Sequence, residues 1–292
     1  MSFTLDALLA LLDLEELEVN IFRGTSRDIG SGRVFGGQVL AQALLAAGRT
    51  VEGGRVAHSL HSYFILPGDL AAPIVYFVER LRDGKSFTTR RVTAIQHGRA
   101  IFEMSASFQH VEPGIDHQAP SPDVPPPESL APDLERVRAA AGRIPEPLRA
   151  IFTADRPFDL RTVNATDPLR PASQDAVRHV WLRTVGDVPN GDVLAHQALL
   201  AYASDYGLLG TALLPHALTF QSPGLQAATL DHAIWFHRPF RADAWLLYAT
   251  DSPSASGARG FARGQVFTRD GLLVASVAQE GLVRLRGGPD AG

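Results

Sequence analysis

Three polar residues in the second half of the chain stand in apolar surroundings: Asp205, Thr229 and Gln279. Asp205 has no Lys or Arg within four positions, so no ion pair on its own helix can offset the cost of burying its carboxylate. Gln279 shares one face of an expected strand with Leu273 and Val277, where a side-chain amide needs hydrogen-bond partners. A carboxylate, a hydroxyl and an amide can together orient a water molecule and remove its proton. If the three side chains meet, they support hydrolysis by an activated water.

Each of these residues also has an ordinary structural interpretation. The side of the helix that carries Ser204 and Asp205 could face solvent. Gln279 could be a core glutamine whose amide bonds to backbone groups. Thr229 stands at the start of an expected strand, where threonine is common. Taken singly, the residues leave both interpretations open.

An internal repeat connects the two halves of the chain. Residues 58–69 (HSLHSYFILPGD) resemble residues 230–243 (LDHAIWFHRPFRAD), and residues 93–109 resemble residues 266–281. Corresponding residues are 172 positions apart in the first pair of segments and 173 apart in the second. Because both order and spacing are kept, the sequence predicts two copies of one fold.

The repeat also gives each of the three polar residues a counterpart in the first half. Thr229 falls opposite Ala57 and Gln279 opposite Ala106, and the first half is apolar near the position that matches Asp205. A group that the fold itself required would recur in both copies. Polar groups confined to one copy therefore indicate one working site in the second half and a degenerate site in the first.

Both copies predict antiparallel strands around one helix. The repeated segments alternate and are rich in β-branched and aromatic residues, and His97-Gly98 and Asp270-Gly271 are typical of tight hairpin turns. Ahead of the strands, residues 36–48 and 194–214 are apolar on nearly every side, which is typical of a buried helix. The predicted fold class is α+β, with an antiparallel β-sheet wrapped around a central α-helix in each copy.

The order of these segments predicts an N-terminal unit at 1–112, a proline-rich linker at 113–165 and a C-terminal unit at 166–292. Residues 113–147 hold nine of the twenty prolines and begin soon after the first strand run. The length of 292 residues also fits two units of ordinary size better than one.

Composition excludes several classes of protein. The net charge is -4 and Lys85 is the single lysine, so no basic surface for nucleic acid is expected. The absence of cysteine removes disulfides and thiolate nucleophiles. No apolar run is long enough to span a membrane, and the N-terminus lacks the pattern of a cleavable signal. We therefore expect a cytoplasmic protein with no membrane or nucleic-acid partner.

Several motifs resemble those of the bacterial acyl-CoA thioesterase II family, whose members are double hotdog proteins. The resemblance covers nearly the whole chain and is carried by VFGGQVLAQAL, HSYFILPGD, RDGKSFTTRRVTAIQHG, IFEMSASFQ, ASD, TLDHAIWFHRPF and VASVAQEG. The family's functional residues are an Asp on the second hotdog helix, a Thr before the DHAIWFHRPF strand and a Gln on the last strand. By motif they match Asp205, Thr229 and Gln279. The resemblance implies a double hotdog fold and hydrolysis of an acyl-CoA substrate.

For a thioester substrate, the three residues predict a mechanism without a covalent intermediate. Asp205 would accept a proton from water, and Thr229 and Gln279 would hold the other hydrogen-bonding positions of that water. Gly36 and Gly37, at the start of the first helix, are candidates to meet the oxyanion through backbone N–H groups. No cofactor is expected, because coenzyme A is part of the substrate.

Coenzyme A carries phosphates, which arginine side chains are suited to bind. The candidates for contacts with coenzyme A, besides the two glycines, are Arg90, Arg91, Arg238, Arg241, Arg259 and Arg263. Any single one of them could equally be an ordinary surface arginine. The histidines in or beside the strands show no metal-ligand spacing, so no metal site is predicted; they are His58, His61, His232 and His237.

Two other functions are compatible with this fold. A hydratase or dehydratase acting on acyl-CoA would need a histidine partnered with Asp205, whereas Tyr202, Tyr206 and Leu209 occupy that neighbourhood. A non-catalytic acyl-CoA-binding module could have kept the pocket and lost the chemistry, although all three polar residues are retained. For any of these functions, we expect assembly into a homo-oligomer, as a dimer or a tetramer.

Overall fold

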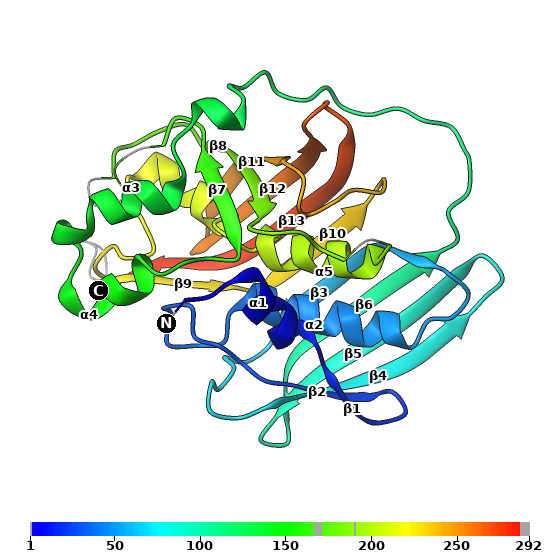
Figure 1. Ribbon diagram of the computed structural model, residues 1–292. Helices are drawn as coiled ribbons and strands as arrows, with labels where there is room; N and C mark the ends of the chain where they lie inside the picture. The colour runs from blue at the N-terminus through cyan, green and yellow to red at the C-terminus, as the bar shows by residue number, and fades with distance from the viewer. Residues whose placement is uncertain (1, 166, 168–170, 190, 287–292) are drawn as a thin grey trace.

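The structure is a computed structural model that describes residues 2–165, 167, 171–189 and 191–286. In the first half, a short helix and two short strands precede the central helix, and four longer strands follow it (Figure 1). These elements are α1 (Leu5–Leu12), β1 (Glu15–Glu18), β2 (Ile21–Gly24), α2 (Gly36–Arg49), β3 (Val56–Phe64), β4 (Ile74–Asp83), β5 (Phe87–Gln96) and β6 (Arg99–Gln109).

The second half repeats this arrangement after a connecting segment. The connecting segment contains η1 (Pro127–Ser129), α3 (Asp133–Ala139), η2 (Ala141–Arg143) and α4 (Glu146–Phe152). The second half then contains β7 (Phe158–Thr162), β8 (Val177–Thr184), α5 (Val193–Ser204), the 3-10 segment η3 (Leu209–His216), β9 (Leu225–Thr229), β10 (Asp231–Phe236), β11 (Leu246–Ser256), β12 (Arg259–Thr268) and β13 (Leu273–Leu285).

The strands of both halves form one antiparallel sheet. Their order is β1-β2-β4-β5-β6-β3-β10-β13-β12-β11-β8-β7, and β9 pairs with β13 beside this path. The halves join where β3 pairs with β10, from Tyr63 opposite Asp231 to Ser59 opposite Trp235. Each half thus contributes a run of antiparallel strands and one central helix, which confirms the predicted α+β architecture (Figure 1).

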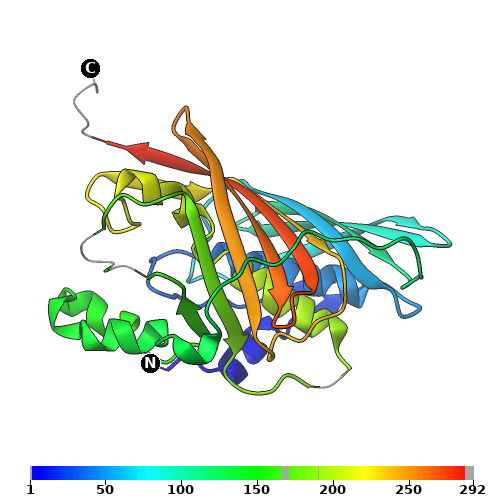
Figure 2. The same cartoon turned by 90° about the horizontal axis from the view of Figure 1, so that it is seen from above.

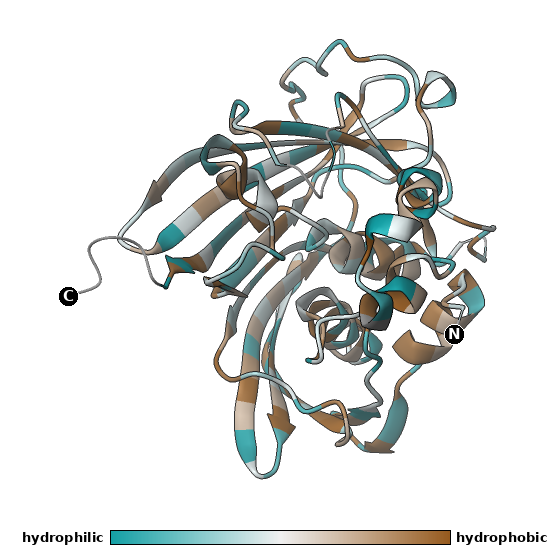
Figure 3. Cartoon of the chain, turned by 90° about the vertical axis from the view of Figure 1, so that its left-hand side faces the viewer, coloured by the Kyte–Doolittle hydropathy of each residue, from teal (hydrophilic) through white to brown (hydrophobic). Residues whose placement is uncertain are grey.

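The two central helices are antiparallel and packed closely together. A β-carbon added to Gly37, near the start of α2, would lie 2.4 Å from the carbonyl oxygen of Tyr202 in α5. At the other end of the pair, a β-carbon on Gly48 would lie 2.4 Å from Cδ2 of Leu194. Glycine at both places allows the backbones to approach. Apolar residues gather along the helices that the curved sheet encloses (Figure 3).

The predicted helix at 194–214 is too long. The α-helix ends at Ser204, Asp205 is its C-cap, and residues Leu209–His216 form the 3-10 segment η3. The interruption coincides with Gly207, whose φ of +70° lies in the left-handed region that favours glycine and commonly ends helices. Asp205 therefore stands at the C-terminal end of a helix and not within one.

The predicted hairpin turns are present. His97 and Gly98 both have positive φ, 49° and 70°, as a two-residue turn between β5 and β6 requires. Gly271 has a φ of 85° in the turn between β12 and β13. Thr229 differs from the prediction, because it is the last residue of β9 and not the first of the next strand.

The proline-rich segment runs over the outer face of the second half (Figure 2). Trp181 Nε1 donates to the carbonyl of Pro125 at 2.9 Å, and Val124 and Leu130 pack on an apolar cluster that contains Trp181 and Phe267. The range predicted as a linker, 113–165, also contains β7, which pairs with β8 along its whole length. Within the described residues, no helix is both long enough and apolar enough to cross a membrane.

Candidate active site

The structure brings Asp205, Thr229 and Gln279 together from three elements. Asp205 is the C-cap of α5, Thr229 ends β9, and Gln279 lies on the inward face of β13, which pairs with β9. Gln279 Nε2 donates to Asp205 Oδ1 and to Thr229 Oγ1, in both cases at 2.8 Å. Thr229 Oγ1 also lies 3.5 Å from Asp205 Oδ1. The carboxylate, the hydroxyl and the amide form one hydrogen-bonded cluster.

The first half completes this cluster through the start of α2. The backbone N–H of Gly37 donates to Asp205 Oδ2 at 2.9 Å. Gly36 is equally close, since a β-carbon there would lie 2.7 Å from the same oxygen and 3.1 Å from the Phe64 ring. Both glycines are therefore at the site, but the N–H of Gly37 is engaged with the carboxylate and not directed at a substrate oxyanion.

Burial has a strong effect on the carboxyl group of Asp205. Desolvation raises its pKa from 3.8 to about 6, although hydrogen bonds from Gln279, Gly37 and Thr229 favour the charged form. The helix termini act in opposite directions, because the C-terminal end of α5 disfavours a negative charge and the N-terminal end of α2 favours one. Asp205 forms no ion pair with any residue that the structure describes.

Gln279 has a free acceptor inside the cluster. The residue is 1% exposed, and its Nε2 is used by Asp205 and Thr229. Its Oε1 is buried and has no hydrogen-bond partner among the described residues. A buried amide oxygen without a donor is costly in a folded protein, so this atom is suited to accept a hydrogen bond from a bound molecule.

Aromatic rings surround the cluster on the side of both helix ends. Phe35 stacks on Tyr206 with ring centroids 5.1 Å apart, and it meets Tyr202 edge to face at 5.0 Å. Phe158 contacts the same two tyrosines at 6.0 and 6.1 Å. The contribution of Phe35 and Phe158 was not predicted, because both are far in sequence from Tyr202 and Tyr206. Desolvation is the main cause of the raised pKa of Asp205, and apolar rings beside both helix ends are consistent with it.

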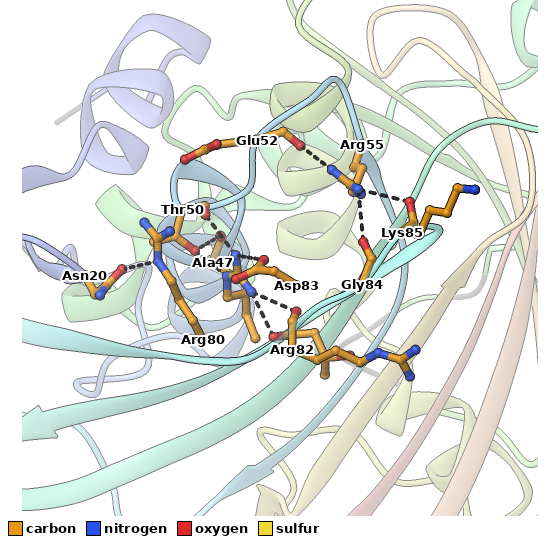
Figure 4. Close-up of polar contacts among 12 residues, drawn as sticks. Asn20, Ala47, Thr50, Glu52, Arg55, Arg80, Arg82, Asp83, Gly84 and Lys85 are labelled. Carbon is orange, nitrogen blue, oxygen red and sulfur yellow. Dashed lines mark hydrogen bonds and ion pairs between the residues drawn. The ribbon is translucent and has the colours of Figure 1, made fainter.

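Arg90 is not available as a contact for coenzyme A. Its side chain is 1% exposed, and its guanidinium donates five hydrogen bonds inside the first half. The acceptors include Oγ1 and the carbonyl of Thr50, at 2.8 and 3.0 Å, and the carboxylate of Asp83 at 2.6 Å. Figure 4 shows Thr50 and Asp83 in this cluster together with Arg82, whose carbonyl accepts another of the bonds. The prediction for Arg90 was wrong because the alternation of β5 directs this residue inward.

Arg90 also lies beside the position in the first half that matches Gln279. It pairs across the sheet with Ala106, the counterpart of Gln279. In the second half, Gln279 pairs with Ala262. The first half thus has a bonded guanidinium at the strand position where the second half has the methyl group of Ala262.

The other arginine candidates lie in surface ion pairs. Arg91 pairs with Glu79, Arg238 with Asp116, and Arg263 with Asp251; Arg241 and Arg259 pair with Asp243 and Glu280. The hydrogen bonds of Asp205 within the described residues come from Gly37, Thr229 and Gln279 and not from these arginines. Their assignment to coenzyme A phosphates stays a prediction.

Three of the four histidines considered for a metal site each bond to a serine hydroxyl. His58 contacts Ser107, His232 contacts Ser204, and His237 contacts Ser276, at 2.8 to 2.9 Å. Over the described part of the chain, no three His, Asp or Glu side chains come close enough to hold a metal ion.

Comparisons with known proteins agree with this arrangement. A family model described as acyl-CoA thioesterase matches residues 147–282, and one described as the acyl-CoA thioesterase N-terminal domain matches residues 25–109. Acyl-CoA thioesterase 2 of Haemophilus influenzae is 45% identical over 97% of this chain and 99% of its own length. Acyl-coenzyme A thioesterase 8 of Homo sapiens is 40% identical over 94% of this chain and 88% of its own length.

Solved structures give the same result. The crystal structure of an acyl-CoA thioesterase II from Mycobacterium marinum is 44% identical in sequence, with a TM-score of 0.79 over 97% of this chain and 100% of that one. A protein from Alicyclobacillus acidocaldarius described as having the hot dog fold is 20% identical, with a TM-score of 0.77, and supports the fold alone. The chain therefore belongs to the acyl-CoA thioesterase II family of double hotdog proteins.

Proposed function

We propose that this enzyme hydrolyses acyl-CoA thioesters with a water molecule activated by Asp205, Thr229 and Gln279. Membership of the family makes the chain an acyl-CoA thioesterase, and the assignment of the chemistry to these three residues is our proposal. The observation that carries it is the shared hydrogen bonding of Gln279 Nε2, which joins the Asp205 carboxylate and the Thr229 hydroxyl at 2.8 Å each.

The proposed reaction begins with proton transfer from water to Asp205. A carboxylate with a pKa of about 6 is largely ionised at neutral pH and is a stronger base than an ordinary aspartate. The water oxygen bonds to the thioester carbonyl carbon, and a tetrahedral intermediate forms. When the carbon–sulfur bond breaks, the proton held by Asp205 passes to the leaving thiolate. The products are a carboxylic acid and free coenzyme A, and Asp205 returns to its ionised form.

Thr229 and Gln279 have distinct tasks in this scheme. Gln279 uses its Nε2 to hold both partners, so its buried Oε1 is left to accept a hydrogen bond from the attacking water. Thr229 Oγ1 accepts the bond from Gln279, which leaves its own hydrogen free to point at Asp205 or at the water. Gly37 holds Oδ2, so Oδ1 is the oxygen that faces the other two residues. Fixed groups of this kind lower the barrier by orienting the reactants before reaction.

The partners of Asp205 favour hydrolysis over hydration. A hydratase would pair this carboxylate with a histidine. In this structure the partners of Asp205 are Gln279, Thr229 and the N–H of Gly37. His232, three residues after Thr229, bonds to Ser204 instead.

The first experiment measures thiol release from a series of acyl-CoAs of increasing chain length. We expect Asp205→Asn to lower kcat/KM at least about a hundredfold, and Thr229→Ala and Gln279→Ala about tenfold or more. Glu15→Gln, which removes an exposed carboxylate paired with Arg23, is the matched control and should leave kcat/KM unchanged. Full activity of Asp205→Asn would refute the proposed mechanism. Binding of acyl-CoA without release by the wild type would instead support a non-catalytic binding module.

A further inference from the structure

The residue directly before Asp205 closes the end of helix α5. Ser204 is fully buried, and its hydroxyl donates to the carbonyl of Ala201 at 2.9 Å. The carbonyl of Ser204 itself accepts from the hydroxyl of Tyr248 at 3.0 Å. The last carbonyls of a helix have no partner within the helix, so these two bonds hold its terminal turn in place.

His232 binds Ser204 from the neighbouring strand. Its Nε2 lies 2.9 Å from Ser204 Oγ, and the residue is 1% exposed. The hydroxyl of Ser204 has one hydrogen, and with that hydrogen on the carbonyl of Ala201, Nε2 of His232 is the donor of the second bond. The imidazole is then neutral with an unprotonated Nδ1, which has no partner among the described residues. Burial lowers the pKa of His232 to about 3, which agrees with a neutral ring.

His232 connects the elements that carry the candidate catalytic residues. It lies on β10, three residues after Thr229, and its ring bonds the last residue of α5 next to Asp205. Its backbone carbonyl accepts from Ser62 Oγ on β3 at 2.8 Å, so the first half also fixes its position. One side chain therefore links the end of α5 to the strand that follows Thr229.

The geometry excludes a nucleophilic role for this serine and histidine. A serine nucleophile needs a histidine that accepts its proton and a route for the substrate carbonyl. Ser204 is fully buried and its hydrogen is directed at a backbone carbonyl. Within the described part of the chain, Nδ1 of His232 has no partner, so the ring lacks the carboxylate that orients the histidine in such a pair.

We propose that Ser204 and His232 are positioning residues for Asp205. The hydrogen bond between them fixes the end of α5, and with it the Asp205 carboxylate, relative to Thr229 and Gln279. The inference rests on the proposed catalytic role of Asp205. A helix C-cap has few constraints of its own, and a displacement of about 1 Å at a reacting group can cost up to about a hundredfold in rate. A bond from β10 to the last helical residue adds to the constraints that Tyr248 and the donors to Asp205 supply.

The test compares Ser204→Ala, His232→Leu and the double variant with the wild type in steady-state thiol release. We expect each single variant to lower kcat about tenfold, with KM changed by less than about twofold, since binding surfaces stay intact. The double variant should also lose about tenfold and not a hundredfold, because both changes remove the same bond. His232→Gln, which can place an N–H donor near Nε2, should recover most of the lost kcat.

Two further variants separate this inference from a general loss of stability and from the proposed mechanism. Thr211→Val removes another fully buried hydroxyl of the second half, bonded to Thr250, and should lower the melting temperature without changing kcat. Asp205→Asn is assayed alongside. Unchanged kcat in both Ser204→Ala and His232→Leu, with Asp205→Asn inactive, would overturn the positioning role alone. Full activity of Asp205→Asn would remove the catalytic role on which it rests.

Discussion

At the scale of single residues, the site places catalysis and stability in opposition. Asp205 is held by three donors, Gln279, Thr229 and Gly37, yet desolvation still raises its pKa to about 6. The folded protein therefore binds a proton at this position more strongly than the unfolded chain does. In the proposed mechanism Asp205 is a base suited to neutral pH because its surroundings disfavour the ionised form of the carboxyl group. The same surroundings lower the stability of the folded protein at neutral pH.

This opposition predicts a pH-dependent effect of Asp205→Asn on stability. The raised pKa means that the wild type loses stability as the pH rises from about 4 to about 6 through ionisation of Asp205, and the loss is complete above about 6. The variant lacks this titration. The free energy of unfolding of the variant minus that of the wild type should therefore be larger at pH 8 than at about pH 4.5. The expected change in this difference is about 2 kcal/mol.

Urea denaturation of both proteins at the two pH values measures this difference. Asp251→Asn serves as the control, because its carboxylate is part of an exposed ion pair. A difference between wild type and Asp205→Asn that is the same at both pH values would show that the Asp205 pKa is not raised by folding.

The sequence was sufficient to predict the three polar residues but not their support. Asp205 stood out because no Lys or Arg lies within four positions of it, and Gln279 because it shares an expected strand face with apolar residues; a buried polar group needs a partner. Their actual partners come from residues far away in the chain, such as Gly37, which is 168 positions from Asp205. Ser204 and His232 gave no signal of their own, since a serine in a helix and a histidine in a strand are common.

At the scale of secondary structure elements, the antiparallel pair of α2 and α5 positions the site. The pair is close because Gly37 and Gly48 have no side chains to separate the helices. Only one end of the pair reaches the candidate site, since Gly37 meets Asp205 whereas Gly48 meets the side chain of Leu194. The position at which α5 ends was not predictable from periodicity, because the apolar run continues past Gly207 into η3.

The two glycines give a matched pair of variants. Gly37→Ala would put a β-carbon 2.4 Å from a backbone carbonyl, so the helices must separate and the bond to Asp205 must lengthen. Gly48→Ala meets side-chain atoms of Leu194 that can rotate away. We expect Gly37→Ala to lower kcat about tenfold or more and Gly48→Ala to leave it within about twofold, although both lower stability. Equal kcat values would show that the end of α2 does not hold the carboxylate.

Replacement of Arg90 tests whether this residue stabilises the first half and does not bind coenzyme A. Replacement by Met keeps the length of the side chain but leaves Thr50 and several carbonyls without a donor, so we expect a loss of about 3 kcal/mol in the free energy of unfolding. The exposed neighbour Arg91 is the control, and Arg91→Met should cost less than about 1 kcal/mol. The KM for acyl-CoA should be unchanged in Arg90→Met. A raised KM with unchanged stability would restore Arg90 as a contact for coenzyme A.

At the scale of the whole molecule, neither half contains the complete site. The second half supplies Asp205, Thr229 and Gln279, and the first supplies the N–H of Gly37 and the ring of Phe35. The β3–β10 pairing and the contact of α2 with α5 hold these groups in register. The internal repeat made two units predictable, but their junction through one continuous sheet depends on long-range pairing that the sequence pattern does not specify.

The linker is expected to be dispensable for activity once the protein has folded. Its first residues, 113–115, are exposed, and its contacts with the second half begin at Asp116 and Gln118. A protease site inserted at Gly114 should therefore be cut without unfolding the protein. Both fragments should elute together on size-exclusion chromatography, and kcat should stay within about twofold of the uncut variant, because the shared sheet and the helix pair remain. Separation of the fragments, or loss of activity while they stay together, would mean that the linker itself holds the halves in the geometry that Asp205 requires.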